Sequence, residues 1–138
     1  MDTGQSEPPV AGGNHITILV IDDDPLVLST IGKMLTLAGY GVIVAQSASQ
    51  ALNIARTTEE NVDLALLDLT IPGLPAERVV AGLKESSPQM RVLLTSGYPL
   101  GDAAPQVLSA GADGFIQKPF ALDKLAGKID ELLGGEPG

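Results

Sequence analysis

Acidic and other polar side chains follow the ends of several apolar segments in this sequence. Asp22 and Asp23 follow the segment ITILVI, and Asp68 closes the segment VDLALLD. Thr95 lies at the end of MRVLLTS, and Lys118 follows DGFIQ. If these segments are neighbouring parallel strands, the five side chains lie at one edge of one sheet, where such sheets bind ligands. A cluster of carboxylates, a hydroxyl and an amine is suited to metal binding and to phosphoryl transfer.

The charges of this cluster indicate its chemistry. Carboxylates about 4 Å apart repel each other by roughly 4 kcal/mol per pair at an effective dielectric constant of about 20. Mg²⁺, which takes one or two carboxylates together with waters and phosphate oxygens, would relieve that repulsion. Lys118 and Thr95 could neutralise and hydrogen-bond phosphoryl oxygens, and aspartate is a known covalent phosphoryl acceptor. Each residue alone could be a helix cap, a turn acid or a solvated side chain, but their joint placement favours a site.

From Ile16 onward, short apolar segments alternate with amphipathic ones. We expect strands over 16–21, 42–45, 62–68, 90–96 and 113–117. We expect helices over 25–39, 47–57, 76–85, 103–110 and 122–133. In the first helix, the spacing of Val27, Ile31, Met34 and Ala38 predicts the face toward the core. The alternation predicts an α/β fold, a doubly wound sandwich with a five-stranded parallel sheet.

The composition limits the class of protein. The chain has 138 residues, a net charge of −9 and no cysteine, so we expect no direct nucleic-acid partner and no disulfide. No apolar run is long enough to span a membrane, and the N-terminus lacks a signal-peptide pattern. We expect a disordered leader over 1–15, one domain over 16–133 and a frayed tail over 134–138, in a cytoplasmic protein.

Four segments, VIDDD, LLDLTIPG, LLTSGY and IQKPF, occur in this order. Together they resemble the receiver domain of two-component response regulators, the CheY-like family, over about residues 16–133. The resemblance implies a flavodoxin-like fold with strand order 2-1-3-4-5. It also implies the following roles: Asp68 as phosphoacceptor; Asp22, Asp23, Asp68 and the Thr70 carbonyl as Mg²⁺ ligands; Thr95 and Lys118 as phosphoryl-stabilising groups; Thr95 and Phe115 as switch residues; and a cis peptide bond before Pro119.

The function implied by the resemblance is a signalling switch in a two-component phosphorelay. A histidine kinase or histidine phosphotransfer protein would donate a phosphoryl group to Asp68, and the surface formed by residues 103–133 would change for a downstream partner. The chain would catalyse only its own phosphorylation and dephosphorylation, and it could form a homodimer through that surface. Because the chain ends soon after the last expected helix, we expect output through protein contact, or a receiver segment taken from a larger protein.

The sequence departs from the family pattern at two positions. Ile71 stands where many members have Met, and Phe115 stands where Tyr is frequent. Since Phe has no hydroxyl to expose, we expect it to point inward, which could weaken its coupling to Thr95. Thr70 and Gly97 occupy positions that tune dephosphorylation in the family, and they leave an attacking water relatively unobstructed.

The same residues raise three alternative functions. An aspartyl-phosphate phosphatase of the haloacid dehalogenase type carries a second acid two residues after its nucleophile, where this chain has Thr70. A nucleotide-binding flavodoxin-like module would need a Gly-rich loop after the first strand, where this chain has acids. An inert pseudo-receiver would need none of the acid, hydroxyl and lysine set that is present here.

Overall fold

The structure, a computed structural model, describes residues 16–99, 101 and 104–134. The expected leader over 1–15 and nearly all of the expected tail lie outside these described residues. None of the described helices is long and apolar enough to cross a membrane.

Strands and helices alternate along the described chain. The strands are β1 (Thr17–Ile21), β2 (Gly41–Ala45), β3 (Leu64–Asp68), β4 (Arg91–Ser96) and β5 (Gly114–Gln117). The helices are α1 (Pro25–Leu37), α2 (Ala48–Thr57), α3 (Ala76–Ser86), α4 (Ala104–Ser109) and α5 (Leu122–Leu132). All strand pairs are parallel, and the sheet order β2-β1-β3-β4-β5 confirms the prediction.

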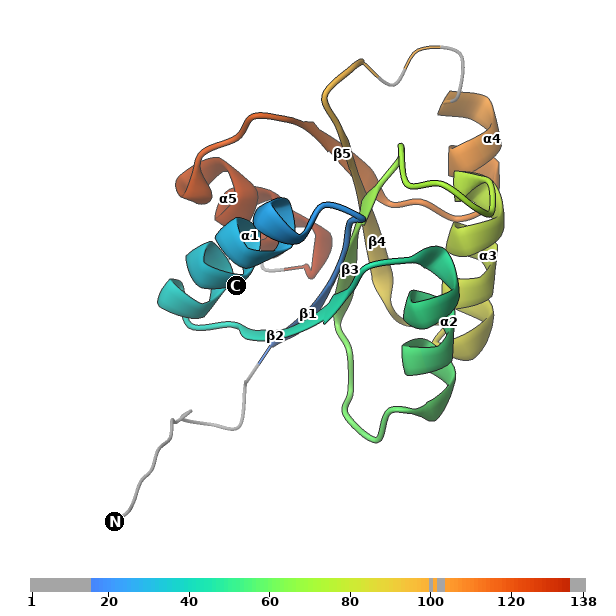
Figure 1. Cartoon of the computed structure of the whole chain (residues 1–138), viewed down its shortest axis with the longest axis horizontal. Helices are drawn as coiled ribbons and strands as arrows, with labels where there is room; N and C mark the ends of the chain where they lie inside the picture. The colour runs from blue at the N-terminus through green and yellow to red at the C-terminus, as the bar shows by residue number, and fades with distance from the viewer. Residues whose placement is uncertain (1–15, 100, 102–103, 135–138) are drawn as a thin grey trace.

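The sheet lies between two layers of helices. Helices α1 and α5 cover one face, and α2, α3 and α4 cover the other (Figure 1). Every residue of β1 and β3 is buried, because a parallel sheet covered on both faces excludes water from both sides of its central strands. The carboxyl ends of β1 and β3 are therefore held rigidly next to each other, with Ile21 paired to Leu67.

Helix α1 begins as the sequence predicts, but its buried face matches the predicted one only in part. Asp24 caps it, with the Leu26 N–H donating to Asp24 Oδ1 at 2.9 Å. The fully buried residues are Leu28, Ile31 and Leu35, and Val27 is partly buried against the same core. The expected face is thus confirmed at Ile31 and in part at Val27, and it is wrong at Ala38, which is exposed, whereas Met34 is half-buried. Two apolar stripes run side by side on this helix, and both have helical spacing. Periodicity alone could not decide between them, and the larger Leu side chains pack against the sheet.

Asp113, in the turn before β5, joins three elements at the opposite edge of the sheet from Asp68. Its Oδ2 accepts hydrogen bonds from Lys84 Nζ and from the Val92 N–H, both at 2.8 Å, and Arg91 Nη1 lies 3.5 Å from its Oδ1.

We expect Asp113→Ala to lower the free energy of unfolding by about 2 kcal/mol, because the buried Val92 N–H loses its acceptor. Urea unfolding checks this, and Asp113→Asn, which keeps an acceptor for Val92, should lose less; equal losses would contradict the explanation.

Candidate functional site

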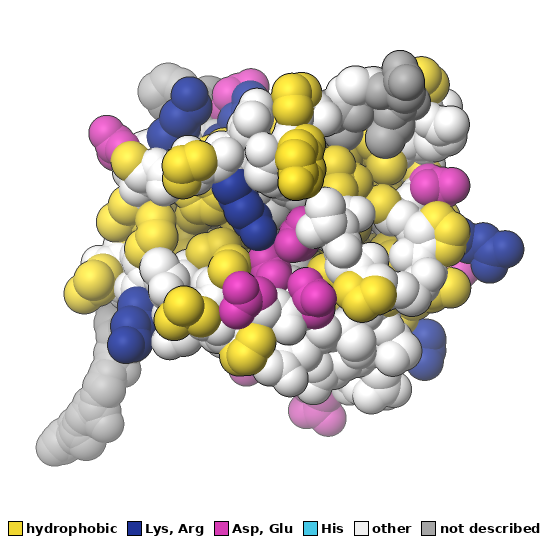
Figure 2. Space-filling view, turned by 45° about the horizontal axis from the view of Figure 1, so that its top comes forward, with side chains coloured by type: hydrophobic (Ala, Val, Ile, Leu, Met, Phe, Trp, Pro, Cys, Tyr) yellow, Lys and Arg dark blue, Asp and Glu magenta, His cyan; other side chains and the backbone are white. Residues whose placement is uncertain are grey.

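The residues proposed from the sequence meet at the carboxyl edge of the sheet. Asp22 directly follows β1, Asp68 ends β3, and Thr95 of β4 pairs with Asp68 in the sheet register. Lys118 directly follows β5 and reaches across to both buried carboxylates. Figure 2 shows acidic side chains gathered at the centre of one face, with a basic side chain beside them.

Three carboxylates form the acidic part of this site. One carboxylate oxygen from each of Asp22, Asp23 and Asp68 lies within 4.8 Å of the others. Asp22 and Asp68 are only 2% and 4% exposed, whereas Asp23 is exposed. Two buried carboxylates and one open to solvent give an all-oxygen donor set that a hard divalent cation can approach from outside. The residues therefore fit a metal such as Mg²⁺.

Lys118 is the cation of the site. Its Nζ lies 2.9 Å from Asp22 Oδ2 and 3.3 Å from Asp68 Oδ2, so its shorter ion pair is with Asp22 and not with the proposed phosphoacceptor. The peptide bond between Lys118 and Pro119 is cis. One ammonium group thus serves two carboxylates, and the site keeps an excess of negative charge.

The surroundings of the two buried carboxylates move their pKa values in opposite directions. Burial raises the pKa of Asp22, and the neighbouring charge of Asp68 adds to this, against the bonds from Asp24 N–H and Lys118. Burial alone would also raise the pKa of Asp68, but two hydrogen bonds from Thr70 and the charge of Lys118 outweigh it and lower that pKa. Burial would lower the pKa of Lys118, yet the two carboxylates raise it, so the lysine stays charged.

Thr70 makes a contact that sequence reasoning missed. Its backbone N–H and its hydroxyl both donate to Asp68 Oδ1, each at 2.9 Å. The sequence did not predict that the Thr70 side chain would bond to the Asp68 carboxylate. A hydroxyl residue two positions after a strand-end aspartate was the available signal, since short polar side chains in such turns often bond to nearby groups.

Thr95 brings an unused donor to the site. The residue is 1% exposed, and its Oγ1 is the one buried side-chain polar atom without a hydrogen-bond partner among the described residues. A buried unpaired hydroxyl is unfavourable and calls for an explanation. Thr95 lies beside Asp68 in the sheet. The hydroxyl is therefore placed to donate a hydrogen bond to an oxygen of a group bound at Asp68.

Two further positions named from the sequence lie around these groups. Phe115 of β5 is half-buried and packs against the core on the side of α2, α3 and α4, in agreement with the expected inward placement. Ile71 is buried in the same core. Both side chains are apolar, so neither can bond to the carboxylates directly.

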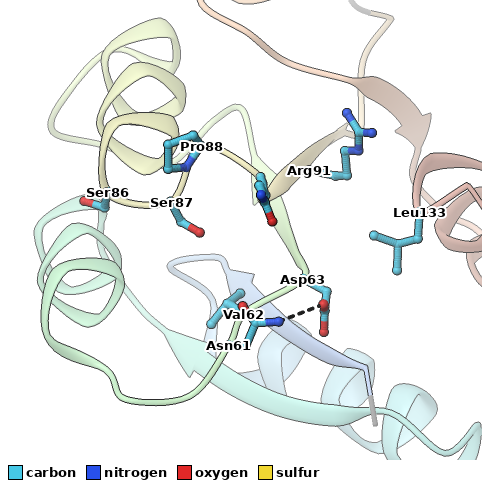
Figure 3. A pocket seen from close by; sticks show the side chains of 9 residues that line it. Asn61, Val62, Asp63, Ser86, Ser87, Pro88, Arg91 and Leu133 are labelled. Atoms are coloured by element: carbon cyan, nitrogen blue, oxygen red, sulfur yellow. Dashed lines mark hydrogen bonds between the residues drawn. The ribbon is translucent and has the colours of Figure 1, made fainter. Parts of the chain in front are cut away.

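A pocket of the described structure lies away from this site. It has a volume of about 700 Å³ and is lined by residues at the opposite edge of the sheet, among them Asn61, Asp63, Ser87 and Arg91 (Figure 3). Asp63 accepts hydrogen bonds there from the Thr17 N–H and from Asn61 Nδ2, so its carboxylate is engaged in holding the start of β1. The pocket contains none of the clustered site residues.

Comparison with known proteins identifies relatives of the whole described domain. The model of the response regulator receiver domain matches residues 18–130. The transcriptional regulatory protein PrrA of Mycobacterium bovis is 35% identical over 133 residues, which is 96% of this chain and 53% of that protein. The chain thus spans about half or less of the length of the curated relatives it matches first.

Solved structures give the same family. The CheY-like receiver domain protein from Methanospirillum hungatei is 30% identical with a TM-score of 0.81, over 88% of this chain and 96% of the other. A response regulator from Burkholderia pseudomallei, solved with a phosphorylated aspartic acid, a calcium ion and citrate, is 26% identical with a TM-score of 0.77. The match covers 87% of this chain and 69% of that one.

Proposed function

Because this chain belongs to the receiver domain family of two-component response regulators, we propose that it is a phosphoacceptor switch whose acceptor is Asp68. The observation that carries the proposal is the convergence of Asp22, Asp68 and Lys118 within hydrogen-bond distance, next to the unpaired hydroxyl of Thr95. The phosphorylated aspartic acid in the Burkholderia pseudomallei relative supports the same chemistry for this chain.

In the proposed reaction, the Asp68 carboxylate attacks the phosphorus atom of a phosphohistidine on a histidine kinase or histidine phosphotransfer protein. A new O–P bond forms, and the P–N bond of the donor breaks, with its electron pair leaving on the imidazole. Lys118 neutralises charge on the phosphoryl oxygens, and the Thr95 hydroxyl donates to one of them. Asp22, Asp23, Asp68 and the Thr70 carbonyl would hold Mg²⁺, which supplies further charge neutralisation when bound.

The proposed output is a shift between two conformations of the surface that carries α4, β5 and α5. Movement of Thr95 toward the phosphoryl group would act on the segment after β4, and so on α4, which is short and carries Pro105. A downstream protein, or a second copy of the chain, would recognise the shifted state. In this proposal Phe115 stays inward in both states, so β5 contributes less to the change than α4.

Phosphorylation by a small donor tests this function directly. Incubation of the chain with acetyl phosphate and Mg²⁺ is expected to add one phosphoryl group, removable by hydroxylamine because it is an acyl phosphate. Omission of Mg²⁺ with added chelator should prevent the addition, since the repulsion among the carboxylates then opposes an incoming phosphate. Intact-mass spectrometry reports both results, and a chain that stays unmodified with Mg²⁺ present would refute the proposal.

A phosphatase function is less favoured by the site. Thr70 stands where a second acid would be needed, and its hydroxyl is bonded to Asp68. Turnover of p-nitrophenyl phosphate far beyond one equivalent would revive that alternative.

A further inference from the structure

The two oxygens of the Asp68 carboxylate have different surroundings. Oδ1 accepts two hydrogen bonds from Thr70, one from the N–H and one from the hydroxyl, both at 2.9 Å. Oδ2 faces Lys118 at 3.3 Å, a longer distance than the 2.9 Å between Lys118 and Asp22. The carboxylate is thus held mainly through Oδ1, by the loop that follows it.

This asymmetry matters because the last torsion of an aspartate side chain is soft. Rotation of a carboxylate about its Cβ–Cγ bond has a broad, two-fold profile, so packing alone fixes it poorly. With one donor on Oδ1, the carboxylate could still rotate about its Cβ–Cγ bond. Two donors from different atoms of one residue also restrain the plane of the carboxylate. Any non-proline residue at position 70 provides the N–H, whereas the second bond comes from the Thr70 side-chain hydroxyl.

We propose that the Thr70 hydroxyl is a positioning group for phosphoryl transfer: its bond to Oδ1 fixes the carboxylate plane and leaves Oδ2, on the side of Lys118, as the attacking oxygen. The inference rests on the proposed function and adds a role for a side chain beyond its backbone carbonyl. In the transfer step, the bond from Oδ2 to phosphorus forms as the bond from phosphorus to the leaving group breaks. Lys118 then lies on the same side as the new phosphoryl oxygens.

The chain offers matched variants to test this role. Thr70→Val keeps the shape and the backbone N–H but removes the hydroxyl, and Thr70→Ser restores a hydroxyl. Thr58→Val is the control, because it makes the same side-chain change at a half-buried threonine whose Oγ1 also takes part in a local hydrogen bond, here accepting from the Glu60 N–H. Thr58 follows α2, and it contacts no residue of the carboxylate cluster in a recorded hydrogen bond.

The measurement is the rate of phosphorylation by acetyl phosphate at saturating Mg²⁺, together with the Mg²⁺ dissociation constant from calorimetry. Thr70→Val should lower the maximal rate about tenfold, the effect expected of one hydrogen bond to a charged group. The Mg²⁺ dissociation constant should stay close to that of the wild type, because the hydroxyl is not among the proposed metal ligands. Thr70→Ser should recover most of the rate, and Thr58→Val should behave as the wild type.

Each other outcome overturns a distinct statement. A normal maximal rate in Thr70→Val refutes the positioning role, as does a loss that Thr70→Ser shares, because the side-chain shape would then be responsible. A large loss of Mg²⁺ affinity with a normal rate at saturation would assign the hydroxyl to the metal and refute the positioning role. Absence of phosphorylation in the wild type refutes the proposed function itself, and the inference with it.

Discussion

Replacing Asp68 with Asn is expected to abolish phosphorylation by acetyl phosphate, even at saturating Mg²⁺. The amide carries no charge, so it is a poor nucleophile and a weaker ligand for a hard cation. It keeps nearly the same shape, and the Thr70 N–H that donates to Oδ1 retains an oxygen acceptor. Loss of modification would therefore report the chemistry of the carboxylate and not the loss of the fold. Intact-mass spectrometry, with circular dichroism as the check on folding, measures the outcome.

The neighbouring Asp24 provides the control for this substitution. Asp24 is exposed and caps α1 through its side chain, and Asn caps helices as well as Asp does. Asp24→Asn thus removes one negative charge beside the cluster without entering it, and it should be phosphorylated like the wild type. If Asp68→Asn still took up a phosphoryl group, the acceptor would lie elsewhere, and borohydride reduction followed by peptide mapping would locate it.

The placement of the site residues at one edge of the sheet was predictable because it depends on chain direction. In a parallel sheet the carboxyl ends of all strands lie at one edge, so Asp22, Asp68 and Thr95 had to converge once their segments were read as neighbouring strands. The same rule places Lys118 at this edge, because it directly follows β5. The order of the strands came from the family resemblance, since alternation of strands and helices alone does not specify it.

The details that the sequence did not predict depend on side-chain direction. The pairing of Lys118 with Asp22 at 2.9 Å and the hydroxyl bond from Thr70 to Asp68 are choices among rotamers within a loop. The buried face of α1 was predicted only in part, because adjacent apolar stripes share one periodicity and contact with the sheet decides between them. Such choices are made by packing, which acts between residues far apart in the chain.

Lys118→Met should produce the largest loss of stability among single substitutions at the site. The side chains of Asp22 and Asp68 are only 3% and 5% exposed, and both have Lys118 as their ion-pair partner. Removal of the ammonium leaves two buried carboxylates that repel each other. Breaking a buried ion pair in this way is expected to lower the free energy of unfolding by roughly 3 kcal/mol, a large share of a typical total stability of about 5–15 kcal/mol. Urea unfolding at neutral pH without divalent cations measures the change.

Two controls, the addition of Mg²⁺ and the substitution of a second lysine, test whether the loss comes from the buried carboxylates. Because Lys118 competes with a cation for the same oxygens, Mg²⁺ should stabilise Lys118→Met more than it stabilises the wild type. Lys128 is the matched control: its Nζ lies 3.8 Å from Oε1 of Glu131, whose side chain is exposed, so Lys128→Met should lose less than about 1 kcal/mol. If the two variants unfold alike, or if Mg²⁺ stabilises Lys118→Met no more than the wild type, Lys118 does not compensate the buried acids. Solvent, which reaches the site at the exposed Asp23, would then have to screen the negative charge. The close approach of Lys118 to Asp22 and Asp68 would lose its electrostatic explanation.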